Sequence, residues 1–335
     1  MKFGFSITGM SQQPRDADMQ RCLEDIITWV HRARDLGFDY ISMGQHYLSA
    51  PYQMLQAVPL LARLAPETGR MGLLTTLVIP LHHPVDLAET LATLDVVSGG
   101  RFMLSCAQGY RDEEYAAFGV DPAQRVSRFV EGVQCLLRLW TEERVTFRGK
   151  HFRLENATVE LRPVQRPHPP VWVAANADTA VQRAARLGLP WNINPHATFA
   201  TVRRQVALYR QAAQEAGKDP NVLLPMGREL YCAPNREQAL EESLPYIYGK
   251  YQAYAQWGQD RVLPGQESFN VGFEELARDR FVIGSPDDCA EALERYAELG
   301  IGYAHFRMSW PGMPLEQAIR GMELFAQRVM PRFKG

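Results

Sequence analysis

The stretch MGLLTTLVIPLHHPVDLAETLATLDVVSGGRFMLSCA, residues 71–107, carries the pattern that decides the fold. It begins with an apolar run, Met71–Ile79, continues with a helix-period segment, Val85–Val97, and ends with a second apolar run, Phe102–Ala107. Apolar residues are nearly continuous in both runs, which is typical of parallel strands that are buried on both faces. The stretch therefore predicts a strand, a helix and a second strand parallel to the first.

The same alternation extends along the chain in both directions. The strand-like runs are Phe3–Thr8, Tyr40–Met43, Met71–Ile79, Phe102–Ala107, Val171–Ala175, Pro190–Ile193, Met226–Cys232 and Tyr303–Met308. The helix-period segments are Met19–Leu36, Met54–Leu64, Val85–Val97, Arg125–Trp140, Thr179–Leu187, Val202–Ala216, Gln238–Trp257, Pro286–Leu299 and Leu315–Met330. Eight strand–helix units close most simply as an α/β fold, the (β/α)8 TIM barrel. An open doubly wound sheet is the rival, but the turn Gly9–Pro14 has no GxGxxG.

Two segments interrupt the barrel pattern. Arg144–Gln165 alternates like paired strands about Arg148-Gly149-Lys150 and predicts a β-hairpin insertion near the fifth strand. Arg261–Phe281 is rich in Gly, Glu and Asp and has weak periodicity, and irregular stretches of this length are usually functional, so we predict a lid. No linker rich in Pro, Gly or Ser divides the chain, so residues 1–335 are expected to form one domain.

Composition and charge argue against several classes of protein. The net charge of −2 over 335 residues, with no block of like charge, does not favour binding of nucleic acid. The five cysteines are widely spaced without a CxxC, which argues against a disulfide framework or a zinc site. The sequence shows neither a signal peptide nor an apolar run of membrane-spanning length. We therefore expect a reduced, cytoplasmic protein without a membrane partner.

The reactive groups of a barrel lie at the carboxyl ends of its strands and in the loops that follow. His46 comes just after the second strand-like run, whereas His82 and His83 precede Pro84 and are better explained as a helix start. The alternative for His46 is a hydrogen-bonded histidine without a chemical task. A metal centre needs three convergent ligands, and the strand ends supply few beside His46, so no metal is expected. GxSxG is absent, which leaves no specific serine triad.

Aromatic and long side chains gather near the strand ends and predict a mouth that holds a flat, largely apolar ligand. By position alone, the candidates for a substrate pocket are Tyr47, Tyr52, Trp191, Met226, Arg228 and Trp310. The alternative for each of them is plain packing.

A set of short motifs is spread over essentially the whole chain. They are Lys2-Phe3-Gly4, Leu36-Gly37-Phe38-Asp39, Pro80-Leu81-His82-His83-Pro84-Val85, Leu94-Asp95, Ser98-Gly99-Gly100-Arg101-Phe102, Gly109–Tyr115 with Phe118-Gly119, Pro169-Pro170-Val171-Trp172-Val173, Gly284-Ser285-Pro286 and Val329-Met330-Pro331. The SGGRF and PxxHPV segments are the specific ones, whereas GSP alone is weak. In this order the motifs resemble the luciferase-like flavin-dependent monooxygenases, the bacterial luciferase family.

The resemblance implies a fold, a cofactor and partners. Members of this family are (β/α)8 barrels that bind reduced flavin at the carboxyl end, as FMNH2 or, in some branches, the deazaflavin F420. Most FMN members receive FMNH2 from a separate flavin reductase, react it with O2 and transfer one oxygen atom, which fits the absence of an NAD(P)-binding motif here. The cofactor carries the difficult chemistry in such enzymes. A homodimer is also expected from the family.

The resemblance also implies roles for residues at matching positions. His46 matches the catalytic histidine, whose role is to stabilise or protonate the flavin peroxide. Thr75-Thr76 match a pair that bends against the flavin ring, often through a non-proline cis bond. Gln108-Gly109-Tyr110 fall where the fourth strand contacts the flavin tail. Asn176-Ala177-Asp178-Thr179 match a helix N-terminus that can hold a phosphate.

The chain departs from luciferase at several of these positions. The Glu-His-His of luciferase is Gln45-His46-Tyr47 here, an arginine near the phosphate is Gln108, and a phosphate-binding serine is Ala177. Asp178 places a negative charge close to the expected phosphate. Weaker phosphate contacts imply a transiently bound reduced flavin or a different flavin tail. Because the predicted lid is shorter than that of luciferase, light emission is not expected.

Three functions remain open from the sequence. The first is an FMNH2- and O2-dependent monooxygenase that acts on a small apolar or aromatic molecule. The second is an F420-dependent hydride-transfer oxidoreductase that needs no O2. The third is a flavin-binding protein without catalysis, which the lost Glu, Arg and Ser positions motivate.

Overall fold

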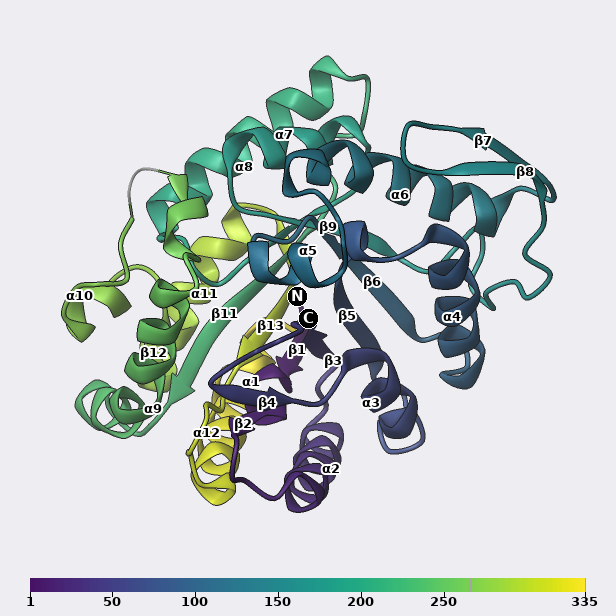
Figure 1. Cartoon of the computed structure of the whole chain (residues 1–335). Coiled ribbons are helices and arrows are strands. Elements are labelled where there is room, and N and C mark those ends of the chain that lie inside the picture. The colour runs from purple at the N-terminus through teal and green to yellow at the C-terminus, as the bar shows by residue number, and fades with distance from the viewer. Residues whose placement is uncertain (265–266, 335) are drawn as a thin grey trace.

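Eight parallel strands form a closed ring at the centre of the molecule (Figure 1). The computed structural model describes residues 1–264 and 267–334 of the chain. The barrel strands are β1 (Lys2–Ser6), β3 (Tyr40–Gly44), β5 (Gly72–Val78), β6 (Phe102–Ala107), β9 (Val171–Ala175), β10 (Trp191–Ile193), β11 (Leu224–Cys232) and β13 (Ile301–Arg307). The pairing of Ile193 with Met226 joins β10 to β11 and closes the ring. The predicted (β/α)8 barrel is therefore confirmed.

Nine long helices of the described chain surround the barrel (Figure 1). They are α2 (Met19–Asp35), α3 (Ala57–Leu64), α4 (Pro84–Val97), α6 (Arg125–Thr141), α7 (Asp178–Arg186), α8 (Phe199–Glu215), α9 (Arg236–Gln256), α11 (Pro286–Glu298) and α12 (Leu315–Arg328). Each begins and ends within a few residues of a predicted segment. Their apolar faces pack on the outward side chains of the strands and form the main core.

Alternate residues of a strand point to opposite faces, and β5 shows which of them point into the barrel. Leu73 and Leu77 belong to the main core between strands and helices. Leu74 instead packs with Tyr40 and Trp172 in a separate cluster. Because these large side chains come from the first halves of their strands, they fill the amino end of the barrel. The cavity described below lies beyond them, at the carboxyl end.

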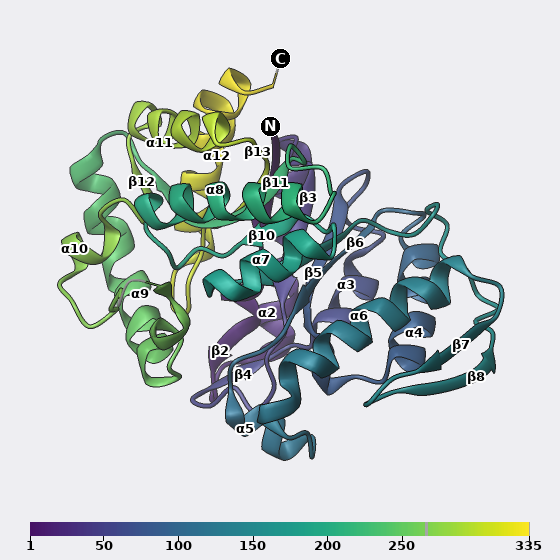
Figure 2. The same cartoon turned by 90° about the horizontal axis from the view of Figure 1, so that it is seen from above.

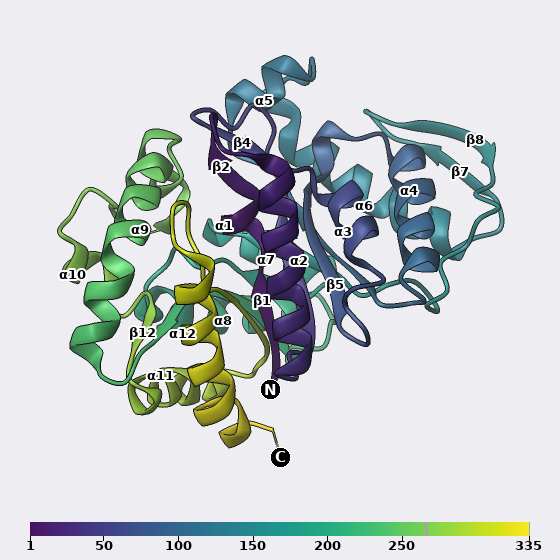
Figure 3. The ribbon, with the colours of Figure 1, turned by 90° about the horizontal axis from the view of Figure 1, so that it is seen from below.

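Figures 2 and 3 show the two ends of the barrel in side view. The chain termini lie at the amino end, where the amino group of Met1 donates a hydrogen bond to the carbonyl of Phe333 at 3.0 Å. Helix α5 (Asp112–Ala117) and the antiparallel pair β2 (Gln12–Pro14) and β4 (Tyr52–Met54) lie at the opposite, carboxyl end. The sequence did not predict this pair, because three-residue strands show no clear period.

The predicted hairpin is confirmed, with β7 (Val145–Arg148) antiparallel to β8 (Arg153–Ala157) beside α6 (Figure 2). One further strand, β12 (Val282–Gly284), pairs in parallel with the end of β11 outside the ring. It lies just after the segment predicted as a lid and was missed because it is only three residues long.

The segment predicted as a lid, Arg261–Phe281, includes residues 265–266, which lie outside the described residues. Its described part contains α10 (Phe273–Ala277) and is anchored at Glu267. The Glu267 carboxylate accepts hydrogen bonds from the hydroxyl of Thr201 at 2.6 Å and from Arg280 at 3.0 Å. Closure of this segment over the barrel stays a prediction.

Within the part of the chain that the structure describes, no helix combines the length and apolar character needed to cross a bilayer.

Candidate functional site

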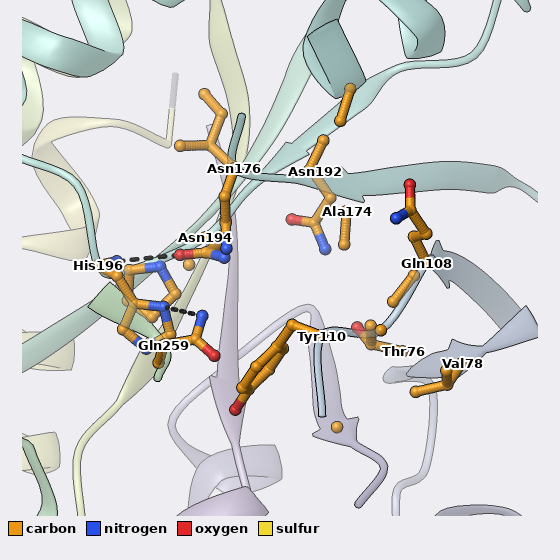
Figure 4. Close-up of a pocket in the computed structure, with 18 of the residues that line it drawn as sticks. Thr76, Val78, Gln108, Tyr110, Ala174, Asn176, Asn192, Asn194, His196 and Gln259 are labelled. Carbon is orange, nitrogen blue, oxygen red and sulfur yellow. Dashed lines mark hydrogen bonds between the residues drawn. The ribbon is translucent and has the colours of Figure 1, made fainter. Parts of the chain in front are cut away.

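A cavity of about 400 Å³ opens at the carboxyl end of the barrel (Figure 4). Part of its lining consists of small residues, namely Gly44, Ala107, Gly109, Ala174, Ala175, Ala177 and Ala180. Gly109 has a φ of +80°, and a Cβ there would lie 2.6 Å from Val78, so the chain turns sharply after β6. Small side chains along a cavity of this volume leave room for a flat, drug-sized molecule.

His46 follows β3 and lines the cavity. Its Nδ1 lies 3.3 Å from Oε1 of Glu114, and its side chain is 18% exposed. The amide of Gln56 donates a hydrogen bond to the His46 carbonyl at 3.0 Å, and the rings of Tyr110 and Trp257 lie 6.1 and 5.8 Å away. Because Nδ1 engages the carboxylate, Nε2 is the nitrogen that can act on a bound molecule.

Glu114 is a buried carboxylate on α5 that holds the loop carrying His46. It also accepts the backbone N–H of Tyr47 at 2.9 Å and faces Arg111 at 3.4 Å. Burial opposes its ionisation, but the hydrogen bond and charge of His46, with those other contacts, outweigh burial and lower the pKa of Glu114. Glu114 lies in a motif that carried the resemblance, yet its role depends on how α5 folds over the β3 loop.

Thr75 and Thr76 lie in the middle of β5 and point to opposite faces. Thr76 lines the cavity, whereas Thr75 is buried outside it and donates a hydrogen bond from Oγ1 to the Met43 carbonyl at 3.2 Å. The non-proline cis bond that is frequent at this position in the family is not found here, since the cis peptides of the described chain precede Pro51 and Pro167. Both threonines pair in regular parallel register with β3 and β6, which requires an extended, trans backbone.

The N-terminus of α7 forms one end of the cavity, where Asn176, Ala177 and Thr179 are among the lining residues. The N-cap residue, Ala177, provides no side-chain hydrogen bond. Without such a cap, the first backbone N–H groups of the helix are available to an anion.

Two arginines that the sequence analysis did not single out line this end of the cavity, Arg125 and Arg183. Arg183 donates a hydrogen bond to Oε1 of Gln108 at 3.0 Å. The signal was present, because Arg183 lies one turn after Thr179 and so shares its face of α7. These two cations give this end of the cavity positive charge although position 108 is a glutamine.

Asp178 does not present its charge to the cavity, which corrects the expectation of a repelling carboxylate. Its two oxygens accept hydrogen bonds from Arg204 of α8 at 2.7 and 2.9 Å. The hydrogen bond from Arg204 is the largest cause of its lowered pKa. Asp178 lines a groove that adjoins the cavity, where α8 neutralises its charge.

Of the residues predicted for a substrate pocket, only Arg228 lines the cavity. Trp191 and Met226 are buried in the main core, and the indole of Trp310 donates to Glu229 at 2.6 Å. Tyr47 packs on Phe118, with ring centroids 4.6 Å apart, and Tyr52 lies in β4. Strand-end position does not fix which face a side chain takes, because a shift of one residue reverses it.

The neighbours of those residues take the inward positions instead. Asn192 and Gly227 line the cavity next to the outward-facing Trp191 and Met226. His305 of β13 also lines it, and burial, with the charges of Arg307 and Arg228, lowers the pKa of His305 to about 3. His305 is therefore neutral at physiological pH.

Asn194, His196, Gln259 and Arg307 complete this side of the cavity (Figure 4). No sequence pattern indicates these residues, because they come from loops and from a strand end with no motif. Residues 1–264 and 267–334 contain no group of three or more His, Cys, Asp or Glu side chains placed to hold a metal ion.

Comparison with known proteins places this geometry in a family. The model of the luciferase-like monooxygenase family matches residues 1–302. The chain belongs to this family. In solved structures, the chain is similar to monooxygenase RslO1 from Streptomyces bottropensis, with 27% identity, a TM-score of 0.83 and coverage of 99% of this chain and 100% of that one. The prediction of the luciferase-like family is confirmed.

Relatives within the family differ in cofactor. The chain is 33% identical to the uncharacterised protein y4wF of Sinorhizobium fredii, over 94% of this chain and 93% of that one. It is 25% identical to the oxygenase component of the flavin-dependent trigonelline monooxygenase of Acinetobacter baylyi, over 98% and 95%. It is also 25% identical to an F420-dependent glucose-6-phosphate dehydrogenase of Microbacterium testaceum, over 90% and 91%. The protein is thus an oxidoreductase of a family whose members use FMN or F420.

Proposed function

We propose that the protein is a monooxygenase that takes reduced FMN from a separate flavin reductase and uses O2 to oxygenate a small apolar or aromatic molecule. The observation that carries the proposal is that one cavity contains both His46 and the uncapped N-terminus of α7 with Arg125 and Arg183. The cavity therefore combines an acid–base group with a phosphate-binding end.

The residues present fit FMN. The N–H groups at the start of α7 and the guanidinium groups of Arg125 and Arg183 would hold the phosphate. The small residues along the wall, such as Ala107 and Ala174, would accommodate the flat ring system beside Thr76. When bound, reduced FMN supplies the electrons that activate O2.

The protein's own side chains orient the His46 ring, keep water away from it and exchange protons with the bound molecules. Glu114 fixes the His46 ring by its contact with Nδ1, so Nε2 gives or takes a proton at the reacting oxygen. Tyr110 and Trp257 flank the imidazole and keep water away from it. These tasks need a fixed imidazole, and the buried carboxylate of Glu114 provides the anchor.

F420-dependent hydride transfer is the second candidate, and one observation favours it. A groove of about 720 Å³ adjoins the phosphate end of the cavity and shares Gln108, Gly109, Arg125 and Thr179 with it. It continues to Arg111, Arg261 and Asp112, so a cofactor tail longer than that of FMN has room there.

The first experiment titrates the protein with FMN and with F420 and follows fluorescence. Our proposal expects FMN to bind more tightly. The second supplies reduced FMN, 18O2 and a panel of aromatic substrates, and expects labelled oxygen in the product. The His46→Ala variant should lower turnover by roughly 100-fold or more, whereas His31→Ala on the outer face of α2 should not. Label entering from water, or tighter F420 binding with turnover under argon, would contradict the proposal.

A further inference from the structure

One side of the cavity is formed by the segment after β10 together with Gln259 (Figure 4). The backbone N–H of His196 donates to Oδ1 of Asn194, and the amide of Gln259 donates to Nδ1 of His196, both at 3.1 Å. We call Asn194, His196, Gln259, Arg228 and Arg307 the His196 wall. In Figure 4 His196 and Gln259 lie across the cavity from Gln108, whereas Asn194 of the wall donates a hydrogen bond to Asn176 at the start of α7.

Four cationic side chains lie in the His196 wall or against it. Arg228 donates a hydrogen bond to the carbonyl of Asn194 at 2.6 Å. Arg280 donates to the carbonyl of His196 at 2.8 Å. The ring of Tyr254 lies 5.3 Å from the His196 ring. The charged groups of Lys250 and Arg307 lie 5.5 and 5.7 Å from the centroid of the Tyr254 ring.

Only two carboxylates of the described chain pair with these cations. Glu229 accepts a hydrogen bond from Arg307 at 2.9 Å, and Glu267 accepts one from Arg280 at 3.0 Å. Arg228 and Lys250 have no carboxylate partner among the described residues. The wall therefore carries an excess of buried positive charge, which is costly unless an anion neutralises it.

Hydrogen-bond donors of the described chain are also left without partners in the His196 wall and at Lys250 behind it. Among the described residues, Nη2 of Arg228, Nζ of Lys250 and Nε2 of His196 are buried without a partner. Since Gln259 donates to Nδ1 of His196, the ring proton is on Nε2, and all three atoms are donors. Buried polar groups are nearly always hydrogen-bonded, and Arg228 and His196 line the cavity, so their unsatisfied donors indicate an acceptor supplied by a ligand.

The effect of the positive charge is visible on the groups it surrounds. Burial and then the charges of Arg307, Lys250, Arg280 and Arg228 hold the pKa of His196 well below its usual range. Burial and then the charge of Arg307 lower the pKa of Lys250 to about 7, against the attraction of Glu229. A bound anion would be attracted by the same charges.

We propose that the His196 wall binds a carboxylate of the substrate, so that the protein acts on a small aromatic or apolar organic acid. The proposal rests on the proposed function, because it leaves the start of α7 to the cofactor phosphate and places the carboxylate at Nε2 of His196 and Nη2 of Arg228. Among the residues that line the cavity, Tyr110, Val78 and Ile193 provide apolar surface for the body of such an acid.

The test measures binding and needs no turnover. Benzoate, phenylacetate and cinnamate, each beside its neutral amide, are titrated calorimetrically into the full-length protein, with and without saturating oxidised FMN. At least one acid should bind roughly tenfold or more tightly than its amide. The Gln259→Glu variant places a like charge in the wall and should cost that acid at least tenfold, whereas Gln259→Met should keep its preference over the amide.

The outcomes separate this proposal from the proposed function. Equal binding of all acids and amides, or no acid binding, overturns the carboxylate site even if FMN binds. A preserved acid affinity in Gln259→Glu, with weakened FMN binding, overturns it too and assigns the wall to the cofactor. An acid preference that Gln259→Glu removes, in a protein that does not bind FMN, supports the acid site and contradicts the proposed function.

Discussion

Nδ1 of His46 lies 3.3 Å from Oε1 of Glu114; the imidazole lines the cavity and is 18% exposed, whereas the carboxylate is 1% exposed. The two residues are 68 positions apart in the chain, so the contact depends on α5 covering the loop after β3. The pair defines which imidazole nitrogen can reach a bound molecule, and it makes Glu114 a positioning residue for His46.

Replacing Glu114 by Gln should therefore lower kcat by roughly tenfold or more, because the amide neither fixes the imidazole through a charge nor stabilises its protonated state in turnover. The affinity for FMN should change little, since Glu114 is not at the phosphate end. Steady-state kinetics and an FMN titration check both expectations. Glu113→Gln is the matched control, because Glu113 also contacts Arg111 but is largely exposed. An unchanged kcat in Glu114→Gln would remove the positioning role.

Replacing Arg183 by Met should weaken FMN binding by roughly 10- to 100-fold, the usual effect of losing a charge-assisted hydrogen bond to phosphate. Riboflavin, which has no phosphate, should bind the variant as it binds the parent protein. Fluorescence titrations with the two flavins measure the difference. Arg186→Met on the same helix is the control, since Arg186 does not line the cavity. Equal losses for FMN and riboflavin would place the phosphate elsewhere.

Lys250 should destabilise the protein in a pH-dependent way. Its pKa is about 7 in the folded protein and ordinarily 10.5, so between these values the unfolded chain binds the additional proton. The cost is fully present below pH 7 and disappears as the pH rises towards 10.5. Lys250→Met should raise Tm at pH 6 by roughly 2 °C or more, with a smaller gain at pH 10. Calorimetric scans at pH 6 and pH 10 measure the two changes in Tm. A gain in Tm that is independent of pH would contradict the lowered pKa of Lys250.

Glu267 should anchor the segment predicted as a lid. Burial opposes its ionisation, but hydrogen bonds from Thr201, Arg280 and Thr198 outweigh burial and lower its pKa. The stabilisation by the ionised Glu267 carboxylate is therefore fully present when the pH is above 4.5, the ordinary carboxyl pKa. It is lost as the pH falls through the lower pKa of the folded protein. Glu267→Gln should make residues 267–281 several-fold more sensitive to proteolysis at pH 7, because a buried ion pair is broken. The control Glu275→Gln, at an exposed position of the same segment, should not raise the sensitivity to proteolysis. Equal cleavage of the two variants would contradict the anchoring role of Glu267.

The fold could be predicted from the sequence because its units are long and repeated. Near-continuous apolar runs such as Phe102–Ala107 and helix-period segments such as Val85–Val97 each carry their own signal. The short strands β2, β4 and β12 could not be predicted from the sequence, since three residues show no period and the pairing of these strands depends on tertiary contacts.

The site could be predicted only in part, because the sequence does not show which way a side chain near a strand end points. A residue near a strand end faces either the cavity or the helices, and the sequence does not say which for Trp191 and Asn192. Arg183 and Glu114 reach the site from helices that pack over the strand ends, so their roles follow from packing. The motif positions His46, Thr76 and Gln108 were placed at the cavity by the resemblance.

A crystal structure of the protein soaked with FMN tests the central claim most directly, that His46 and the start of α7 serve one flavin. The account predicts the phosphate at the α7 N-terminus within hydrogen-bond distance of Arg125 or Arg183, and the ring system beside Thr76 within reach of Nε2 of His46. A phosphate bound away from α7, or a ring system that His46 does not contact, would contradict it.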